Sequence, residues 1–572
     1  MRSRILHDTG SLRLVAWLVL ALAAGGAGVC AAAQYEPLRD EPAVWYADDQ
    51  QPVPMPEFVE ERYVPYAFNS FVARPFSRFF HPGRVGRNLD DSYAGRPAVD
   101  VNALDEVVNS SWFTNRMGVR MLTDEELVQG PALGTNLHRG PDRSQPWRIV
   151  GAKVGGVTPG FRIKDARGDI WLLKFDPPTH PGMSIRSGVV GNLLFHAIGF
   201  STPVDRVVEF TRDDLVVEEE VAFNLGRGET LALTPANLDS VLTATRSVFG
   251  DRYQALASRF LDGRPVGPFD DEDTRPDDPN DIIHHQDRRE LRALKVFGAW
   301  LNHFDLKSLN TLDMYVGEPG EGYVKHYFID FASTLGSYGD EAVKRFGYEY
   351  GIDFFPVLGR FFTFGTVEDY WYGIERPAGL AEVGLFDVEH FRPAAWKPDL
   401  PHSALANLAR DDGYWAAKIV GSFSDRQLRL LVEQGHYRNP RAVDYLVEVL
   451  AGRRDRIVRH WFAEVPPLDW FRTTADGLAF DDLAVVRGCV RENKSRYRYR
   501  VRPVDEWRRG DGWSPWRATP QRVFEVAPDA GLVDAERPFL AVEFQVDRGM
   551  GWSHSAFVFQ APASGRIVGV QR

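Results

Sequence analysis

The sequence predicts an α+β fold in two lobes, a β-rich small lobe and a helical large lobe, followed by a small all-β sandwich-like domain. Short strand patterns separated by Gly, Asp and Pro fill residues 141–262, and amphipathic helical patterns fill residues 286–466. Residues 467–572 alternate apolar and polar residues, as in RVFEVAP and PFLAVEFQVDRG. At 572 residues the chain is long enough for several domains.

Composition and charge narrow the class of protein. Hydrophobic residues make up 44% of the chain and charged residues 26%, which is ordinary for a folded domain. The net charge of -12 argues against a nucleic-acid partner, since such proteins usually carry a basic surplus. One cationic run, Arg491–Arg502, is expected to line the solvent face of a strand.

The amino terminus predicts a secretory signal peptide over residues 1–33. Basic residues precede the apolar run LVAWLVLALAAGGAGV, and Ala31–Ala33 forms a cleavage site before Gln34. Cys30 follows Ala-Gly-Val, a poor lipoprotein signal, so a cleaved leader is favoured over a lipid anchor. Cleavage leaves Cys489 as the single cysteine and excludes an internal disulfide. No later segment has the roughly 20 apolar residues of a membrane helix, so we expect a periplasmic or secreted protein whose mature chain has no transmembrane segment.

Two segments around the lobes differ from them in composition. Residues 34–140 are rich in Pro, Tyr, Phe and Arg and are expected to form an arm with a helical extension, which packs aromatic side chains on a neighbouring domain. Residues 263–285 are acidic and proline-rich, a composition that cannot bury a core and predicts a surface linker or insertion. The strands and helix expected in the small lobe are Trp147–Val154, Gly160–Lys164, Asp169–Phe175, the helix Ser187–Ile198, and Val204–Phe210.

The stretch His303–Asn310, HFDLKSLN, is the most informative about function. It follows the helical pattern RRELRALKVFGAWL and precedes the apolar NTLDMYV, so Asp305 is expected at the interface between the lobes. Lys307 could neutralise charge on a transferred phosphoryl group, and Asn310 offers a neutral oxygen of the kind that Mg²⁺ accepts. The alternative is a polar loop whose Asp and Asn only cap turns.

Two further charged residues lie in apolar surroundings. Lys174 projects from the strand WLLKFD, where a cation is costly without a partner, and nucleotide phosphates would provide one. Asp330 lies between two apolar residues at a strand end, so a metal or a cationic partner is expected there. The alternative for Lys174 is an edge strand that faces water.

A glycine-rich stretch, GAKVGGVTPGF, lies between the first two expected strands. Gly155 and Gly156 would let backbone amides approach phosphates closely, and Lys153 could add a second cation. The spacing differs from G-x-G-x-x-G, and glycine-rich hairpins also occur without any ligand.

The sequence lacks the residue spacing that is typical of two other kinds of active site. Four histidines, His284, His285, His303 and His326, suggest zinc, but no H-x-x-x-H or H-E-x-x-H pattern and no usable cysteine accompany them. No G-x-S-x-G motif supports a serine hydrolase.

Taken together, these residues resemble the protein-kinase-like superfamily. HFDLKSLN has the spacing of the catalytic loop H-x-D-x-K-x-x-N, and IDFASTLG follows where kinases keep a second metal carboxylate. The chain is similar to the atypical branches, the HipA-type bacterial kinases and the secretory-pathway kinases. It also resembles a family of exported bacterial proteins that share KFDPP, WLNH-D and IDF-STLG signatures. The resemblance covers residues 145–465.

The resemblance implies an ATP-dependent phosphotransferase that uses Mg²⁺ or Mn²⁺ and acts on a hydroxyl of a protein, glycan or small molecule. It implies Asp305 as catalytic base, Lys174 as the phosphate-binding lysine, and Asn310 with Asp330 as metal ligands. His303 would hold the catalytic loop in place. With the groups argued above, the candidate residues are catalytic Asp305, Lys307 and His303; cofactor-binding Lys174, Lys153, Gly155 and Gly156; and metal-binding Asn310 and Asp330.

Two departures from the kinase pattern leave a second interpretation open. Kinases pair the strand lysine with a glutamate on the following helix, but SGVVGNLLFHAIG has no acidic residue. Either Glu209 or one of Glu218–Glu220 substitutes, or the pair is absent. Ala332 stands where many kinases have glycine. These departures favour an inactive pseudokinase, a binding scaffold of the cell envelope, whereas the intact catalytic loop opposes it.

A third interpretation starts from the C-terminal domain. Its tryptophans, Trp507, Trp513, Trp516 and Trp552, could bind a carbohydrate or another envelope component. In a β-sandwich such tryptophans more often belong to the core, and that is the expectation for these four.

Overall fold

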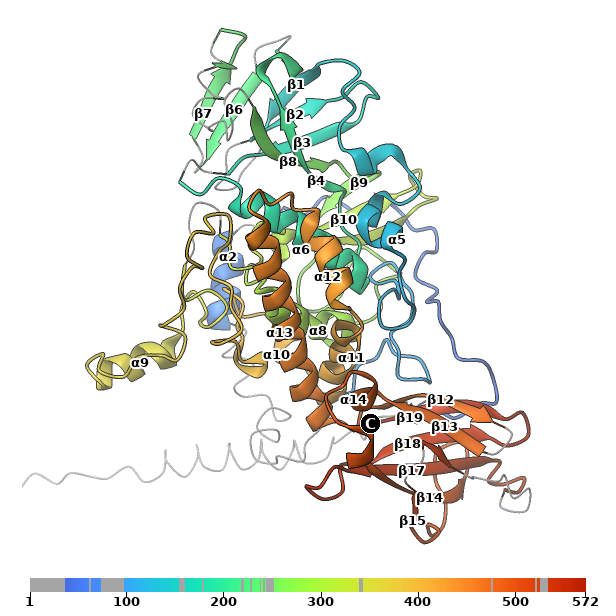
Figure 1. Cartoon of the computed structure of the whole chain (residues 1–572). Coiled ribbons are helices and arrows are strands. Elements are labelled where there is room, and N and C mark those ends of the chain that lie inside the picture. The colour runs from blue at the N-terminus through green and yellow to red at the C-terminus, as the bar shows by residue number, and fades with distance from the viewer. Residues whose placement is uncertain are drawn as a thin grey trace, which may run out of the picture.

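A computed structural model describes the chain in fourteen stretches. These are residues 36–60, 63–73, 97–153, 160–176, 179–217, 221–226, 229–236, 238–239, 242, 252–338, 343–474, 477–519, 522–524 and 533–572. Within them, a β-rich region, a mainly helical region and a second β-rich region follow one another along the molecule (Figure 1). The expected signal peptide and the glycines Gly155 and Gly156 lie outside the described residues.

The first β-rich region is built on an eight-stranded sheet within the described residues. Its strands are β1 (Trp147–Ala152), β2 (Gly160–Lys164), β3 (Ile170–Lys174), β4 (Asp205–Phe210), β5 (Leu215–Val216), β6 (Val221–Gly226), β7 (Glu229–Leu233) and β8 (Tyr253–Arg259). The order is β4-β8-β3-β2-β1-β5, and β6 and β7 extend from β2. The pairing places Lys174 opposite Gly160 on one side and Leu256 on the other.

The helix α6 (Met183–Ile198) lies against this sheet and begins four residues before the expected Ser187. Its early start has a cause eight residues upstream. The buried carboxylate of Asp176 accepts the backbone N–H groups of Ser184 at 3.1 Å and Ile185 at 3.2 Å, which satisfies amides that a helix start leaves without partners. Apolar residues cover all sides of α6, so the helix is buried throughout.

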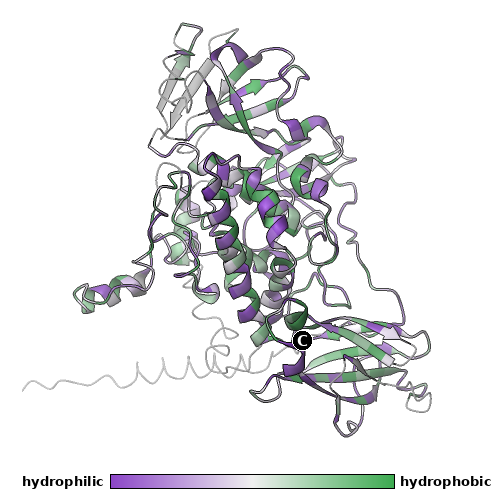
Figure 2. Cartoon of the chain, viewed as in Figure 1, coloured by the Kyte–Doolittle hydropathy of each residue, from purple (hydrophilic) through white to green (hydrophobic). Residues whose placement is uncertain are grey.

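The helical region surrounds a large apolar core. Its helices are α8 (Arg289–Leu301), α9 (Phe354–Phe362), α10 (Ser403–Ala406), α11 (Arg410–Gly421), α12 (Asp425–Glu433) and α13 (Pro440–Glu464), and a short α5 (Asp124–Gln129) packs beside α12. Hydrophobic and hydrophilic residues alternate along α13, as in an amphipathic helix (Figure 2). No helix in the described ranges combines the length and apolar character needed to cross a bilayer.

A three-stranded sheet connects the helical region to the first sheet. It consists of β9 (Arg264–Gly267), β10 (Thr311–Val316) and β11 (Tyr323–Phe328), in the order β11-β10-β9. The catalytic-loop motif enters this sheet directly, because the turn η6 (Ser308–Asn310) leads into β10. β11 in turn ends two residues before Asp330.

The acidic segment 263–285 corrects one expectation. It was expected to remain at the surface, but Asp271, Asp278 and Asp281 are buried. Asp281 contacts the imidazole of His285 at 2.7 Å and the guanidinium of Arg288 at 3.1 Å. Cationic partners therefore make burial of this acidic segment possible, which composition alone could not indicate.

The C-terminal region has two sheets that share one apolar core. The smaller sheet holds β12 (Leu468–Thr474), β13 (Gly477–Asp482) and β16 (Val523–Phe524), with the turn α14 (Leu483–Val486) after β13. The larger holds β14 (Arg496–Val504), β15 (Arg517–Thr519), β17 (Phe539–Asp547), β18 (Ala556–Ala561) and β19 (Arg566–Gln571). The side chain of Arg572 pairs with Asp469 on β12 and with Asp105, each at 3.0 Å, and so ties the end of the chain to the N-terminal segment.

Three of the four C-terminal tryptophans, Trp507, Trp516 and Trp552, lie outside the core, contrary to expectation, whereas Trp513 packs against an apolar cluster. Trp507 and Trp552 are exposed. Trp513 and Trp516 lie half-buried on the surface of β14, where the guanidinium of Arg500 is 4.9 Å and 4.5 Å from their ring centroids. Alternating arginines on the outer face of β14 provide a stacking surface for these rings.

The N-terminal arm runs across all three regions. The Leu38 N–H donates to the Glu506 carbonyl in the C-terminal region, and Val53 pairs with Gly322 beside β11. The arm then forms α2 (Tyr63–Phe68) and the π-helical turn η1 (Asn69–Ala73).

Candidate active site

The catalytic-loop motif follows the end of α8. Phe304 and Leu306 are buried, whereas Asp305 and Lys307, which alternate with them, are only partly buried. The apolar residues anchor the loop, and the alternation directs the two charged side chains to its other side. A tight pattern of apolar and charged residues thus positions the two groups of greatest chemical interest.

The carboxylate of Asp305 is held on both oxygens. Lys307 Nζ lies 2.6 Å from Oδ1, and the amide nitrogen of Asn310 donates to Oδ2 at 2.9 Å and to the Asp305 carbonyl at 2.8 Å. Because the amide nitrogen of Asn310 faces Asp305, its oxygen Oδ1 is the atom that could coordinate a cation. Three of the predicted site residues therefore form one hydrogen-bonded unit.

His303 is a buried structural group. Its Nδ1 lies 3.3 Å from the carbonyl of Ser333, and its ring contacts Phe195 and Phe331. Burial lowers the pKa of His303 to about 4 in spite of the opposing charge of Asp305, so the imidazole is neutral near pH 7. It connects the catalytic loop to the segment after Asp330 and is unsuited to proton transfer at neutral pH.

Asp330 lies beside the catalytic loop at the end of β11. The Ile329 N–H donates to the Asn310 carbonyl at 2.9 Å, which brings the two predicted metal ligands next to each other. Asp330 has a left-handed backbone with φ of 61°, and its side chain is 41% exposed. The amino group of Lys174 lies 3.1 Å from its Oδ1. Burial favours the neutral acid, but Lys174 and then Lys153 outweigh it and hold the pKa of Asp330 at about 2.

Lys153 is the second cation on the sheet side of the site. Burial, and then repulsion from Lys174, lowers its pKa to about 8, although Asp330 acts in the opposite direction. Gly160 on β2 permits this arrangement, since a Cβ there would lie 3.2 Å from the Lys153 Cδ and 2.4 Å from the Leu173 carbonyl. The absence of a side chain at Gly160 therefore leaves room for Lys153 beside β2.

The predicted substitutes for the missing helix glutamate do not contact Lys174 where the structure describes them. The carboxylate of Glu209 accepts a hydrogen bond from Gln254 at 3.2 Å and lies 3.7 Å from Arg438. Glu218–Glu220 lie outside the described residues.

An acidic residue that the sequence analysis missed, Asp205, lies on the Lys174 face of the sheet. On β8, Asp205 is opposite Ser258 and Lys174 is opposite Leu256, and residues two apart on a strand share a face. Asp205 is buried, and its Oδ1 has no hydrogen-bond partner. Burial raises the pKa of Asp205 to about 6, opposed by a hydrogen bond from Ser258 and by the charge of Lys174. Asp205 shares its face of β4 with the half-buried Val207 and Glu209, so the pattern DRVVEF gave no signal that this acid would be buried.

Helix α6 holds the segment after Asp330 through close contacts of small residues. A Cβ on Gly191 would lie 2.8 Å from the Thr334 hydroxyl, and one on Gly188 3.5 Å from the Ala332 nitrogen. Thr334 Oγ1 donates to the Ser187 carbonyl at 2.9 Å. The positive φ lies at Asp330 and not at Ala332, so alanine in place of the kinase glycine is compatible with this backbone.

The N-terminal arm contacts the catalytic loop, which the sequence did not predict in detail. The Ser308 N–H donates to the hydroxyl of buried Tyr66 at 3.3 Å, and Lys307 Nζ lies 5.9 Å from the ring centroid of Tyr63. The arm therefore lies on the side of the loop that carries Lys307.

The histidines do not form a zinc site. His285 and His326 are buried against Asp281 and Asp313, at 2.7 Å and 2.6 Å, in separate pairs. Over the described ranges, no group of three or more His, Cys, Asp or Glu side chains is arranged to hold a metal ion.

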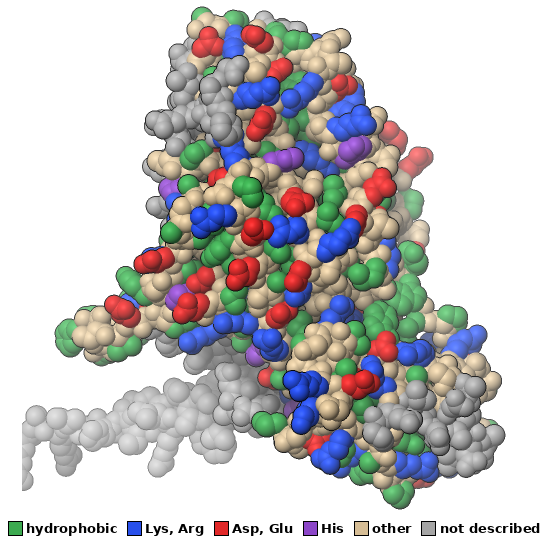
Figure 3. Space-filling model, in the orientation of Figure 1, with side chains coloured by type: hydrophobic (Ala, Val, Ile, Leu, Met, Phe, Trp, Pro, Cys, Tyr) green, Lys and Arg blue, Asp and Glu red, His purple; other side chains and the backbone are tan. Residues whose placement is uncertain are grey.

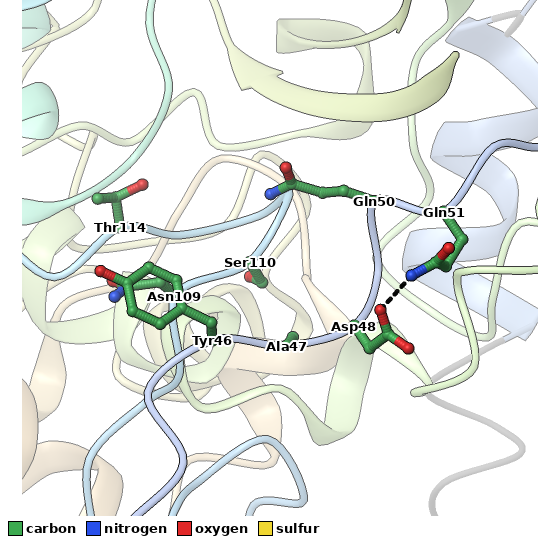
Figure 4. A pocket seen from close by; sticks show the side chains of 8 residues that line it. All are labelled: Tyr46, Ala47, Asp48, Gln50, Gln51, Asn109, Ser110 and Thr114. Carbon is green, nitrogen blue, oxygen red and sulfur yellow. Dashed lines mark hydrogen bonds between the residues drawn. The ribbon is translucent and has the colours of Figure 1, made fainter. Parts of the chain in front are cut away.

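A separate hollow of about 330 Å³ lies between the arm and residues 109–114 (Figure 4). Its lining residues are Tyr46, Ala47, Asp48, Gln50, Gln51, Asn109, Ser110 and Thr114. The one carboxylate among them, Asp48, accepts a hydrogen bond from Gln51. The hollow contains none of the predicted site residues and shows no grouping suited to catalysis.

The donor set of the candidate site fits a nucleotide with a divalent cation. Mg²⁺ prefers a few carboxylate and amide oxygens supplemented by phosphate oxygens, and Asp330 and Asn310 supply one of each. The ammonium groups of Lys174, Lys153 and Lys307 match the negative charge of a polyphosphate.

No family model matches the chain, and a comparison with curated proteins finds no match. Among solved structures, the chain is similar to the Helicobacter pylori proinflammatory kinase CtkA, at 11% identity and a TM-score of 0.30, over 56% of this chain and 98% of that one. It is also similar to the golgi casein kinase, at 9% identity and a TM-score of 0.27, over 72% of this chain and 95% of that one. TM-scores of this size carry no argument, so the interpretation of the site rests on the geometry of its own residues.

Proposed function

We propose that the chain is an exported phosphotransferase that uses ATP and a divalent metal ion to phosphorylate a hydroxyl acceptor. In this proposal residues 141–262 and 286–466 are the two lobes of a protein-kinase-like fold, and residues 467–572 form a sandwich-like domain beside them. The observation that carries the proposal is the meeting of two distant segments. Lys174 on β3 contacts Asp330 after β11, and a backbone hydrogen bond joins the Asp330 segment to Asn310 of the catalytic loop.

The charges of the site suit phosphoryl transfer. A metal ion bound with ATP would neutralise charge on the phosphates, and Asp330 and Asn310 would hold it. Lys174 and Lys153 would then bind phosphate oxygens. Breaking the Lys174–Asp330 contact would leave neither group without a partner, because the carboxylate would gain the metal and the ammonium would gain the phosphates.

Asp305 is the group best placed to receive the acceptor proton. Its carboxylate is oriented by contacts from Lys307 on one oxygen and Asn310 on the other, and a carboxylate held in this way can accept a hydrogen bond from the acceptor hydroxyl. Lys307 would stabilise negative charge that develops on the transferred group. His303 positions the loop and remains neutral.

A pseudokinase is the second candidate, favoured by one specific observation. The direct contact between Lys174 and Asp330 satisfies each charge with the other, and α6 carries no acidic residue to compete for the lysine. A chain that keeps this contact permanently would bind no nucleotide and would act as a scaffold at the cell envelope.

Two single substitutions separate the candidates. We expect Asp330→Ala to abolish metal-dependent ATP binding in calorimetry. We expect Asp305→Ala to retain binding and to lower ATP turnover by about 10²–10⁴-fold, the usual contribution of a general base. The exposed Glu433→Ala on α12 is the matched control and should behave as the parent. ATP binding by none of the proteins would support the scaffold, and equal turnover in all of them would contradict the assigned roles.

Export is tested by the amino terminus of the protein recovered from a Gram-negative host that expresses the full sequence. The proposal expects a periplasmic or secreted form that begins at Gln34. A cytoplasmic protein that retains residues 1–33 would contradict it.

A further inference from the structure

A run of exposed apolar residues lies on α9 and the turn that follows it. Figure 1 shows α9 projecting sideways from the helical region, and Figure 3 shows hydrophobic side chains at the end of this projection. The apolar tip, as we define it, comprises the exposed residues Ile352, Val357, Leu358, Phe361, Phe362, Phe364 and Val367. Phe361, Phe362 and Phe364 are 72%, 73% and 92% exposed. Contiguous exposed apolar surface of this kind marks an interaction site.

The polar groups of the tip are satisfied within the segment itself. The hydroxyl of Thr363 donates to the Gly359 carbonyl at 2.9 Å, and that of Thr366 donates to the Thr363 carbonyl at 2.6 Å. The backbone N–H groups of Thr363, Phe364, Gly365 and Thr366 also donate to carbonyls between Gly359 and Thr363. A segment with these donors internally paired loses fewer hydrogen bonds when it leaves water, which favours its entry into the lipid interface.

The charged side chains of the segment form ion pairs with residues outside the tip. Between Ile352 and Val367 the sequence has two charged residues, Asp353 and Arg360. Arg360 pairs with Glu349 and with Asp369, and Asp353 pairs with Lys397. The tip therefore offers no charged side chain that could recognise a specific protein partner.

Basic and aromatic side chains form a collar behind the tip, consisting of Lys344, Tyr350, Tyr372 and Lys397. Lys344 Nζ lies 5.9 Å from the ring centroid of Tyr372, and Lys397 Nζ lies 5.1 Å from that of Tyr350. Tyrosine and lysine are the residues that occupy the headgroup level of membrane proteins, with apolar side chains beyond them. The apolar side chains of the tip thus match the acyl chains of a bilayer, and the lysines and tyrosines of the collar match the headgroup level.

A hollow of about 660 Å³ lies at the base of the tip. Its charged lining residues are Lys344, Arg345, Arg360, Glu349, Glu368 and Asp369, three of each sign. A lining with no net charge gives no electrostatic preference for an anionic headgroup over a zwitterionic one.

We propose that the apolar tip inserts into the interface of a zwitterionic lipid bilayer and attaches the protein peripherally. The tip would reach about 5–10 Å into the boundary between headgroups and acyl chains. A projecting tip whose threonine hydroxyls and Arg360 already have partners suits a fluid surface better than a protein groove that would fix its register. This proposal does not rest on the proposed function.

Flotation with vesicles tests the proposal on the mature chain, residues 34–572. The vesicles consist of phosphatidylcholine and phosphatidylethanolamine, with and without added phosphatidylglycerol. The test variant is the double substitution Phe361→Ser and Phe362→Ser. The matched control is Phe58→Ser with Ile282→Ser, which removes two exposed apolar side chains elsewhere. All three proteins should unfold at the same temperature, because none of the substituted side chains is buried.

We expect the parent and the control to float with the zwitterionic vesicles and the test variant to lose about tenfold or more of this binding. Added phosphatidylglycerol, or NaCl at about 0.5 M, should change the binding of the parent little, since salt screens charges and leaves apolar burial intact. Absence of binding by the parent, or equal binding by the test variant, would overturn the proposal. Dimers that form without vesicles and are lost in the test variant would assign the tip to a second copy of the chain and would also overturn it.

Discussion

The amino group of Lys174 lies 3.1 Å from the carboxylate of Asp330, although 156 residues separate them in the chain. This contact replaces the lysine–glutamate pair that the kinase resemblance leads one to expect. Nucleotide phosphates would therefore compete with Asp330 for Lys174, and a metal ion would compete with Lys174 for Asp330. The resulting balance of charges determines how the site should respond to substitution and to pH.

Replacing Lys174 with methionine should weaken nucleotide binding and change the acidity of Asp330. Loss of the Lys174 ammonium removes the largest of the charges that lower the pKa of Asp330, so that this pKa rises from about 2 although Lys153 still opposes the rise. Because a carboxylate binds metal only when it is charged, any metal-dependent binding left in the variant should disappear on acidification at a higher pH than in the parent. Titration of a fluorescent ATP analogue with Mg²⁺ between pH 7 and pH 4 measures this, and identical pH profiles would contradict it.

Asp205→Asn should reduce nucleotide affinity by about tenfold while leaving the fold intact. Asp205 is the buried acid on the Lys174 face of the sheet, so its charge should hold the lysine over the site once Asp330 binds a metal. Because its pKa is raised, to about 6, the charged acid costs stability at neutral pH, and the amide should not lower the unfolding temperature. Calorimetry with ATP and Mg²⁺ gives the affinity.

Glu209→Gln is the control for the Asp205 variant, since it removes an acid from the same strand. The Glu209 side chain contacts Gln254 and Arg438 and not Lys174. Equal loss of affinity in both variants would show that Asp205 has no particular relation to Lys174.

Nucleotide affinity should fall between pH 7 and pH 9 through Lys153. Burial lowers the pKa of Lys153 to about 8, so its ammonium, and with it one attraction for phosphate, is lost as the pH rises through that value. Lys153→Arg should remove the fall, since a guanidinium stays charged throughout this range. Binding titrations at several pH values test this, and a fall of the same size in the variant would assign it to another group.

Asp176→Asn should change how stability depends on pH. Burial raises the pKa of Asp176 to about 7, against three opposing backbone hydrogen bonds. A raised carboxylate pKa means that the folded state binds the proton more tightly, so this residue makes the protein less stable as the pH rises from about 4 to 7. The asparagine variant should therefore gain stability relative to the parent at pH 8 compared with pH 5. Urea unfolding at both values measures the difference, and a constant difference would refute the assignment.

The sequence was most informative where the chemistry is contiguous. His303, Asp305, Lys307 and Asn310 lie within one turn of loop, so their spacing alone indicates that they share a site. The structure brings these four residues and Asp330 together, with Lys174 in contact with Asp330.

What the sequence could not indicate depends on partners that lie far apart. Asp205 lies on the same face of the sheet as Lys174 because of the register of β3, β8 and β4, and no local sequence pattern indicates that register. Asp281 is buried because His285 and Arg288 turn back onto it, so the acidic composition of its segment was misleading. Trp516 and Trp552 lie outside the core, where Arg498 on β14 stacks against both rings, and residues that alternate along one strand in this way look like an ordinary core pattern.

Thermal unfolding of the mature chain with ATP, in the presence and absence of Mg²⁺, tests the proposed function most directly. A ligand at 100 times its dissociation constant adds about 2.7 kcal/mol to the stability of the native state. The proposal predicts a rise in unfolding temperature that requires both ATP and the metal and that disappears in Asp330→Ala. Unfolding temperatures that ATP and Mg²⁺ leave unchanged in the parent would contradict nucleotide binding at this site.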